Sequence, residues 1–126
     1  RLSIALELFQ HCRAAGLESN RLVIDPVVAP LIWQDGLQRN RDLLEMLRRL
    51  PELLDVPVQT IVGLSNLTTG KGPPDLKRRL EQAYLCMLAA AGLSWVLLDI
   101  HHHKTVSFAH SARLLLESSI FAWPSV

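Results

Sequence analysis

Asp25 is the first residue whose type and position could do chemistry. It closes the apolar run at residues 21–25 and is followed by Pro26, which has no backbone N–H to neutralise the carboxylate. A carboxylate in this position could accept hydrogen bonds from the N–H edge of a bound heterocycle. An equally good interpretation is that Asp25 caps its own loop through the backbone, as Asp side chains often do.

Gly63, Ser65 and Asn66 form a second candidate group, at the end of the apolar run at residues 58–63. A glycine at the exit of a strand lets a ligand or another backbone approach closely. The uncharged Asn66 amide both donates and accepts hydrogen bonds, which suits a ligand whose protonation changes during a reaction. Taken alone, the short motif is equally compatible with an asparagine in a turn.

A third group follows residues 94–99, where Asp99 precedes His101, His102 and His103. Three histidines suggest a metal site, but consecutive residues of an extended chain point in alternating directions, so at most two could face one ion. We therefore expect a solvated loop here and no metal. No spacing of Cys and His residues elsewhere resembles a zinc site.

The three apolar runs, at residues 21–25, 58–63 and 94–99, are predicted to be strands of a parallel sheet, in that spatial order. They are short and lack polar alternation, which is typical of strands buried on both faces. Helical patterns separate them, so right-handed crossovers connect neighbouring strands. The sheet could be open and doubly wound, with helices on both faces, or part of a barrel, with helices on one face. Both architectures bind ligands where the strands end.

Four helices are predicted from apolar residues that recur every three or four positions. The first ends near Gly16, the second stops at Pro51, and the third begins with Asp75 as its N-cap and ends at Gly92. The apolar stripe of the third helix is Leu76, Leu80, Ala83, Tyr84, Met87 and Leu88. The last helix covers roughly residues 106–118, with Phe108, Ala112, Leu115 and Leu116 directed inward. The tryptophans are expected to be core or packing residues: Trp33, Trp95 and Trp123.

Composition limits the classes of partner. The chain has 126 residues, 49% of them hydrophobic and 20% charged, which fits one globular domain or a piece of one. The net charge is +1, so no excess of charge attracts nucleic acid or an anionic membrane. Asp25, Gln34 and Asp99 interrupt the longest apolar stretches, which argues against a membrane helix. Cys12 and Cys86 lie in helical patterns and are expected to be buried thiols in a reducing compartment, the cytoplasm.

Two motifs taken together resemble a known family. They are IDPVV at residues 24–28 and TIVGLSNLT at residues 60–68, and the similarity continues through residues 84–87, 91–93 and 112–116. The sequence is similar to the pterin-binding methyltransferases, which include methyltetrahydrofolate:corrinoid protein methyltransferases and the folate domain of cobalamin-dependent methionine synthase.

The resemblance implies an α/β fold in which residues 1–126 are the C-terminal portion of a TIM (β/α)8 barrel of the dihydropteroate synthase-like type. About three parallel strands and four helices are expected. On this interpretation Asp25, Asn66 and Asp99 end the sixth, seventh and eighth strands, and the first five strands belong to a missing N-terminal half. The chain also begins within a helical pattern, so we expect it to be cut from a longer protein.

The resemblance also implies chemistry within one-carbon metabolism. Family members transfer a methyl group from N5 of methyltetrahydrofolate, or of a related methylpterin, to Co(I) of a corrinoid (cobalamin) carried by a partner protein or domain. The residue that Asp25 matches holds part of the pterin ring. The residue that Asn66 matches approaches N5, so Asn66 is the candidate catalytic residue. The candidate substrate-binding residues are Asp25, Gly63, Ser65, Asn66, Lys77 and Asp99.

Two alternatives remain beside the methyltransferase. One is a half-barrel that binds a pterin or a corrinoid protein without turnover. The other is a relative of dihydropteroate synthase, which carries Ser-Arg-Lys where this chain has Ser65, Asn66 and Leu67; the absence of both cations favours the methyltransferase. Lys77 and Glu81 depart from the family pattern, because an Arg and an Asn stand at these positions in its members.

A partial barrel has physical consequences of its own. Three strands of eight leave two sheet edges exposed, together with the barrel-facing sides of Val23, Ile61 and Leu97. We therefore expect the 126 residues to self-associate. We also expect them to be inactive alone, because other ring-binding residues of the family lie in the missing half.

Overall fold

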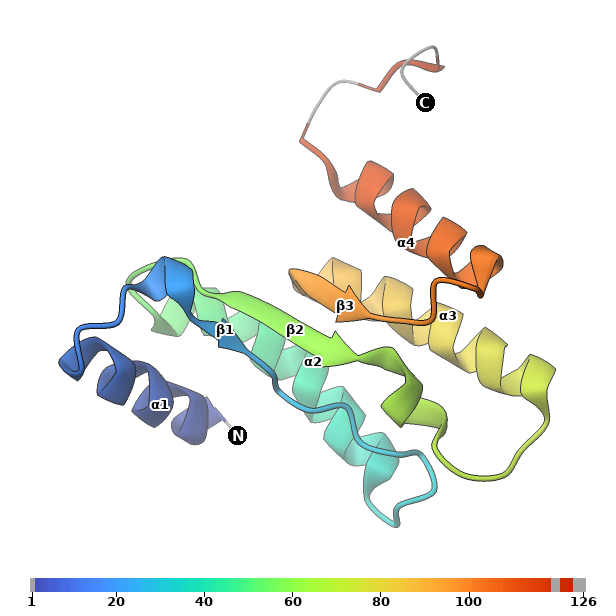
Figure 1. The fold of residues 1–126 in the computed structure, drawn as a ribbon, viewed down its shortest axis with the longest axis horizontal. Coiled ribbons are helices and arrows are strands. Elements are labelled where there is room, and N and C mark those ends of the chain that lie inside the picture. Colours follow the sequence, from blue (N-terminus) through green and yellow to red (C-terminus); the bar gives the residue numbers. More distant parts are fainter. Residues whose placement is uncertain (1, 119–120, 124–126) are drawn as a thin grey trace.

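The computed structural model describes residues 2–118 and 121–123 of the chain. In this part of the chain, four α-helices alternate with three short strands (Figure 1). The strands form one parallel sheet in the order β1-β2-β3, as predicted. The elements are α1 (Leu2–Ala14), the 3-10 turn η1 (Ser19–Arg21), β1 (Val23–Ile24), α2 (Gly36–Leu53), β2 (Gln59–Gly63), the 3-10 turn η2 (Leu64–Thr68), α3 (Pro74–Ala91), β3 (Trp95–Leu97) and α4 (His103–Leu116).

The two faces of the sheet differ sharply in burial. Ile24 pairs with Thr60 and Val62 pairs with Val96, so these four residues lie on one face. Ile24, Thr60 and Val62 are buried there, and Val96 is half-buried. The opposite face carries the alternate residues Val23, Gln59, Ile61, Trp95 and Leu97. We call the first the covered face and the second the bare face.

Two hydrophobic clusters join the covered face to the helices. Val62 packs in the larger cluster with residues of α2 and α3, including Leu43 and Leu88. Ile24 packs in the second cluster with residues of α1 and α2, including Phe9. Helices α2 and α3 lie behind the sheet in Figure 1, and α4 packs along α3. With its helices on one face, the sheet is compatible with part of an α/β barrel.

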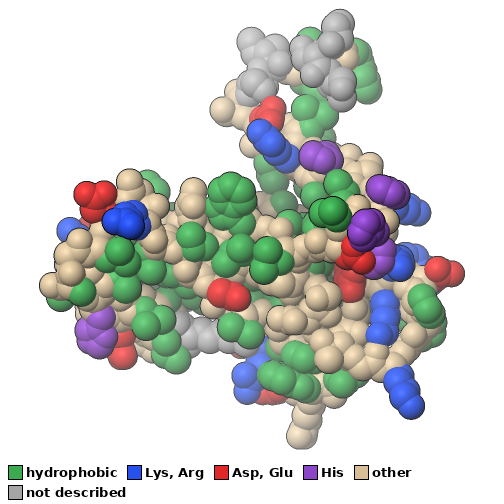
Figure 2. All heavy atoms as spheres, viewed as in Figure 1, with side chains coloured by type: hydrophobic (Ala, Val, Ile, Leu, Met, Phe, Trp, Pro, Cys, Tyr) green, Lys and Arg blue, Asp and Glu red, His purple; other side chains and the backbone are tan. Residues whose placement is uncertain are grey.

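The prediction of strands buried on both faces is wrong, whereas the exposure predicted for Val23 and Leu97 in a partial barrel is confirmed. On the bare face, 44% of Val23, 56% of Trp95 and 64% of Leu97 is exposed, and Ile61 is half-buried. Figure 2 shows hydrophobic side chains exposed over the sheet in this view. The apolar content of the strands was interpreted correctly, but in the described residues only one face has helices packed against it.

Three helix boundaries also differ from those predicted. Helix α2 continues through Pro51 to Leu53, because a proline in the last turn removes only one intrahelical hydrogen bond. Helix α3 begins at Pro74, so Asp75 lies in its first turn and is not the N-cap. Proline suits this position because its missing N–H would have had no helical partner. Helix α4 begins at His103, ahead of residue 106.

Several apolar side chains lie elsewhere than predicted. The tryptophans are exposed rather than in the core, with Trp123 81% exposed. Helix α3 buries Tyr84, Leu85, Leu88 and Ala91, whereas Leu76, Leu80 and Met87 of the predicted stripe are exposed. On α4 Ala112 is buried, but Phe108, Leu115 and Leu116 are exposed. The stripes were correctly recognised as helical, but the helices lack partners on part of their apolar surface.

The two cysteines are free thiols and are half-buried, whereas burial was predicted. Both predicted left-handed helix ends are confirmed, since φ is +83° at Gly16 and +105° at Gly92. Among the described residues, no helix has the length and hydrophobicity needed to span a bilayer.

Candidate functional site

The candidate residues gather along the edge where the three parallel strands end. Asp25 follows β1 directly, Asn66 lies in the η2 turn directly after β2, and Asp99 comes two residues after β3. Parallel strands place these ends at the same edge of the sheet (Figure 1). Asp25 and Asn66 therefore follow neighbouring strands of the sheet.

Asp25 caps its own loop. Its Oδ1 atom accepts a hydrogen bond of 2.8 Å from the backbone N–H of Val27, as the loop-capping interpretation predicts. Val27 has φ of +63°, which is rare for a β-branched residue and costs backbone energy. The capping bond thus holds a strained turn. Asp25 remains exposed, and its Oδ2 atom makes no hydrogen bond among the described residues.

The loop after β1 is clamped by a residue that the sequence analysis missed. Asn40 is buried on α2; its Oδ1 accepts from the N–H of Ala29 at 2.9 Å, and its Nδ2 donates to the carbonyl of Ala29 at 2.8 Å. The Tyr84 hydroxyl, on α3, donates to the Asn40 carbonyl at 2.7 Å. An asparagine one turn before the buried pair Leu43 and Leu44 was the available signal, because a buried amide needs specific partners.

Asn66 lies against the end of β2. The side-chain amide is exposed, and its Nδ2 is 3.5 Å from the position that a Cβ atom on Gly63 would occupy. The glycine thus leaves open space beside the amide. The backbone carbonyl of Asn66 accepts hydrogen bonds from the backbone N–H of Thr69 at 3.3 Å and from the Thr69 hydroxyl at 3.0 Å. These bonds fix the turn. Ser65 is exposed beside it.

A backbone hydrogen bond joins the two loops. The N–H of Leu31, in the segment after β1, donates to the carbonyl of Leu67 in η2 at 2.9 Å. Strand alternation places Asp25 on the same face as Val23, which is the bare face. Gly63 also belongs to the bare face, because it pairs with Leu97. Asp25 and Gly63 therefore lie on the side of the bare face, at the ends of neighbouring strands, and Asn66 lies beside Gly63.

Asp99 forms a separate group at the end of β3. Its Oδ1 accepts from the backbone N–H of His101 at 2.9 Å, and its Oδ2 lies 3.4 Å from Nε2 of His102. The pKa of Asp99 is lowered, chiefly by the hydrogen bond from the backbone N–H of His101 and further by electrostatic interaction with His102, His101 and Arg78. Asp99 is thus held as a carboxylate within its own turn.

Lys77 is engaged by the loop before α3. Its ammonium donates to the carbonyl of Gly70, and the Thr68 hydroxyl donates to the Glu81 carboxylate. The two residues that depart from the family pattern thus tie η2 and the following loop to α3. Sequence reasoning did not foresee this arrangement, because the partners lie seven and thirteen residues away.

Sequence reasoning also missed a basic cavity near Asp99. It has a volume of about 480 Å³ and is lined on one side by Arg78 and Arg79 of α3. Lys104 of α4 and the three histidines border it on the other side. Of these residues, the sequence analysis considered only the three histidines, as a solvated loop.

The exposed polar side chains at the strand ends include those of Asp25, Ser65 and Asn66. In residues 2–118 and 121–123, no three His, Cys, Asp or Glu side chains converge to hold a metal ion. At the rim of the bare face, a carboxylate and an amide offer an acceptor and a donor beside open space. No protein-family model matches the chain.

Proposed function

We propose that the chain forms the pterin-binding part of a methyltransferase, which moves a methyl group from N5 of methyltetrahydrofolate to Co(I) of a corrinoid protein. One observation carries the proposal: Asp25 and Asn66 follow adjacent parallel strands at the rim of one sheet face, in loops that are hydrogen-bonded to each other. A flat ring placed there would have the carboxylate at one edge and the amide at another.

The architecture proposed is the C-terminal portion of a TIM barrel of the dihydropteroate synthase-like type. All helices pack on the covered face, as they do on the outside of a barrel. The bare face, with Val23, Ile61 and Leu97, then corresponds to the barrel interior. Strands beyond this chain would cover it, and they would supply further contacts to the ring.

Asp25 and Asn66 would have different roles. The Asp25 carboxylate keeps its Oδ2 for an N–H edge of the pterin while Oδ1 holds the turn. When the bond between N5 and the methyl carbon breaks, its electron pair returns to N5, and a donor there stabilises the developing charge. The Asn66 amide provides such a donor and adds no competing nucleophile. The corrinoid of the partner protein supplies the nucleophilic metal that accepts the methyl group.

The uncharged character of this strand end supports methyl transfer over the dihydropteroate synthase reaction. Ser65 and Asn66 are exposed and neutral, and Leu67 is buried. The enzyme family with Ser-Arg-Lys at this point uses two cations for an anionic leaving group. A leaving nitrogen needs a hydrogen-bond donor more than a full charge.

The test is methyl transfer by the barrel that contains these strands, with methyltetrahydrofolate and a corrinoid protein reduced to Co(I). We expect Asn66→Ala to lower the transfer rate by on the order of 10²-fold, as for loss of one transition-state donor, while folate binding falls much less. Asn20→Ala is the matched control, because Asn20 is an exposed asparagine in η1, before β1.

Equal losses of rate and binding in Asn66→Ala would contradict a catalytic role for the amide. Pterin binding without any methyl transfer by the unmodified barrel would favour the alternative of a binding module. Failure to bind any pterin, with the fold intact, would overturn the proposal as a whole.

A further inference from the structure

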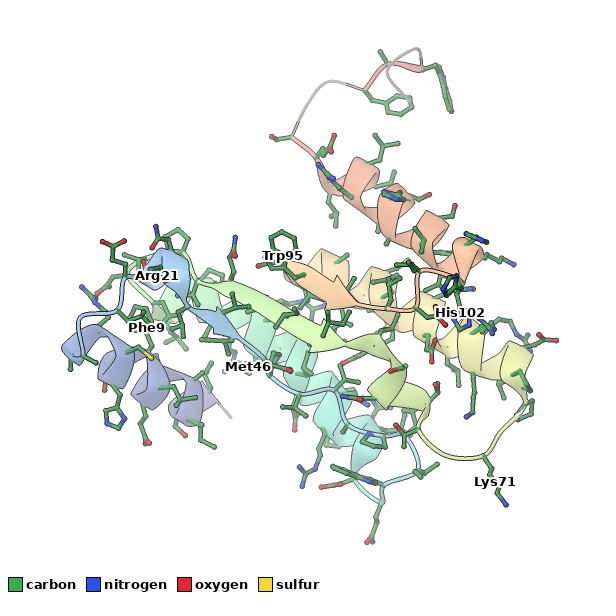
Figure 3. The ribbon with its side chains drawn as sticks, in the orientation of Figure 1. Phe9, Arg21, Met46, Lys71, Trp95 and His102 are labelled. Carbon is green, nitrogen blue, oxygen red and sulfur yellow. The ribbon has the colours of Figure 1, made fainter. Side chains whose placement is uncertain are left out.

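The basic cavity near Asp99 lies between the beginnings of two helices. Arg78 and Arg79 come from the second turn of α3, and His103 and Lys104 are the first residues of α4. Figure 3 shows His102 at the start of α4, beside the end of β3. Figure 2 shows histidine and basic side chains together on this side of the molecule. The cavity is thus on the same sheet edge as Asp25 and Asn66, at the end of a different strand.

The charge balance of the cavity favours an anion. Arg78, Arg79 and Lys104 are permanent cations. They face two carboxylates, that of Asp75 in the lining and that of Asp99, which interacts with Arg78 and His102 next to the cavity. Arg79 and Lys104 form no ion pair with any residue that the structure describes. Like charges held near one another repel, so a bound anion would lower the electrostatic energy of the group.

The beginning of α4 adds to this field. Helix α4 has no side-chain hydrogen bond at its N-cap, His102, and its first residues His103 and Lys104 line the cavity. The first N–H groups of a helix carry partial positive charge and bind anions readily. Helix α3 adds its arginine side chains only, because Pro73 and Pro74 have no backbone N–H.

The back of the cavity is rigid. Gln82 is only 5% exposed, and its Nε2 donates to the Thr105 hydroxyl at 3.2 Å. Thr105 is itself only 2% exposed. The bond ties α3 to α4 directly below the basic residues. The helices that carry the basic side chains are therefore fixed in place before any ligand arrives, which reduces the entropic cost of binding.

We propose that this cavity binds the carboxylates of the folate's γ-glutamate tail. The oxyanion chemistry follows from the cavity itself, whereas the identity of the ligand rests on the proposed function. A pterin at the ends of β1 and β2 would leave its tail free to follow the sheet edge toward α4. Carboxylates pair with arginine through two parallel hydrogen bonds, and phosphate shares this chemistry, so both need to be tested.

The experiment is calorimetric titration of the 126-residue chain with tri-γ-glutamate, which has no pterin. We expect binding that weakens as salt rises from about 0.05 to about 0.5 M. The double variant R78A/R79A should bind at least about tenfold more weakly, as expected on losing charge-assisted hydrogen bonds. Arg41→Ala is the control, because Arg41 is an exposed arginine of α2 outside the cavity. Arg79→Gln and Lys104→Gln change exposed residues and provide milder variants should the double variant fail to fold.

Equal binding by R78A/R79A and Arg41→Ala, or no binding of tri-γ-glutamate with the fold intact, would overturn the inference. Binding of inorganic pyrophosphate but not of tri-γ-glutamate would overturn the tail as occupant and leave a phosphate site. Titration of the complete barrel, which contains all the ring-binding residues, with a pterin that lacks the tail separates the two proposals. If tri-γ-glutamate binds and the pterin does not, the cavity is confirmed as a carboxylate site and the pterin proposal fails.

Discussion

The covered and bare faces of the sheet contain similar residues in opposite surroundings. Val62 and Ile24 on the covered face are almost fully buried, whereas Val23 and Leu97 on the bare face are about half exposed or more. Both sets are aliphatic and both follow strand alternation. Hydrophobic residues therefore indicate that a face of the sheet can be buried. Whether that face is buried depends on the helices that pack against it.

The bare face also carries a side-chain hydrogen bond between β2 and β3. The Trp95 indole N–H donates to Oε1 of Gln59 at 3.1 Å, so a polar group is included among its apolar neighbours. The rim of this face holds Asp25 and Asn66. Exposed apolar area of this kind marks an interaction surface in soluble proteins. We propose that it is the interior of a barrel, and that in the isolated chain it promotes self-association.

Truncation on the two faces should have very different costs. Val62→Ala removes packed methyl groups from a fully buried site, so it should destabilise the fold by about 2–3 kcal/mol. Leu97→Ala removes a side chain that is 64% exposed and should change stability by no more than about 0.5 kcal/mol. Urea unfolding of both variants measures the difference. A cost for Leu97→Ala as large as that for Val62→Ala would show that the bare face is buried in solution.

Polar substitution of the bare face should weaken self-association. Trp95→Ser with Leu97→Ser removes the two most exposed of its apolar side chains, and we expect the association constant to fall by about tenfold or more. Sedimentation velocity over a range of concentrations measures this. Leu115→Ser, on α4, is the control, since this leucine is 83% exposed but lies away from the sheet. An equal effect of the control would assign the association to another surface.

Gly63→Ala separates the structural and functional roles of the bare face. The new Cβ would contact Asn66 Nδ2 at 3.5 Å, an ordinary van der Waals distance, and the φ of Gly63 is −90°. Stability should therefore change by less than about 0.5 kcal/mol. Pterin binding by the complete barrel should fall, because the methyl group fills the space beside the amide. Unchanged binding would place the ligand elsewhere.

The smallest effect concerns charge at the sheet edge. Asp99 has a lowered pKa in the folded state, so its ionised form stabilises the fold above the pKa of the unfolded chain. That contribution is lost as pH falls through the folded pKa, below the ordinary carboxyl range. Asp99→Asn should thus be slightly less stable than the unmodified chain at about pH 7, and the difference should shrink as pH falls below the ordinary carboxyl range. The Val62→Ala penalty should persist at both pH values. NMR titration of the Asp99 carboxyl group tests the shift directly.

Several features were predictable because they depend on nearby residues alone. Apolar runs that alternate along the chain with helical patterns predicted three parallel strands and four helices in the correct order. Gly16 and Gly92 end helices because glycine adopts positive φ at little cost. Asp25 caps its loop through a hydrogen bond to a residue two positions away, and this capping role was one of the two interpretations of Asp25 in the sequence analysis.

Other features required partners distant in the sequence. The Asn40 clamp joins Ala29 and Tyr84, which lie 11 and 44 residues away. The exposure of Trp95 depends on which side of the sheet the helices cover. No local pattern contains that information, because the side chains of a strand alternate between the two faces whichever face the helices cover.

The sequence by itself determined the order of strands and helices, the helix ends at glycine and the placement of polar residues after each strand. The tertiary structure decided that every helix packs on one face, that the Asn66 amide lies beside Gly63, and that α3 and α4 bring Arg79 and Lys104 to one cavity. The physical reason is the distance along the chain over which each kind of interaction acts. Backbone preferences act over a few residues, whereas burial and charge clustering depend on packing between elements far apart in the chain.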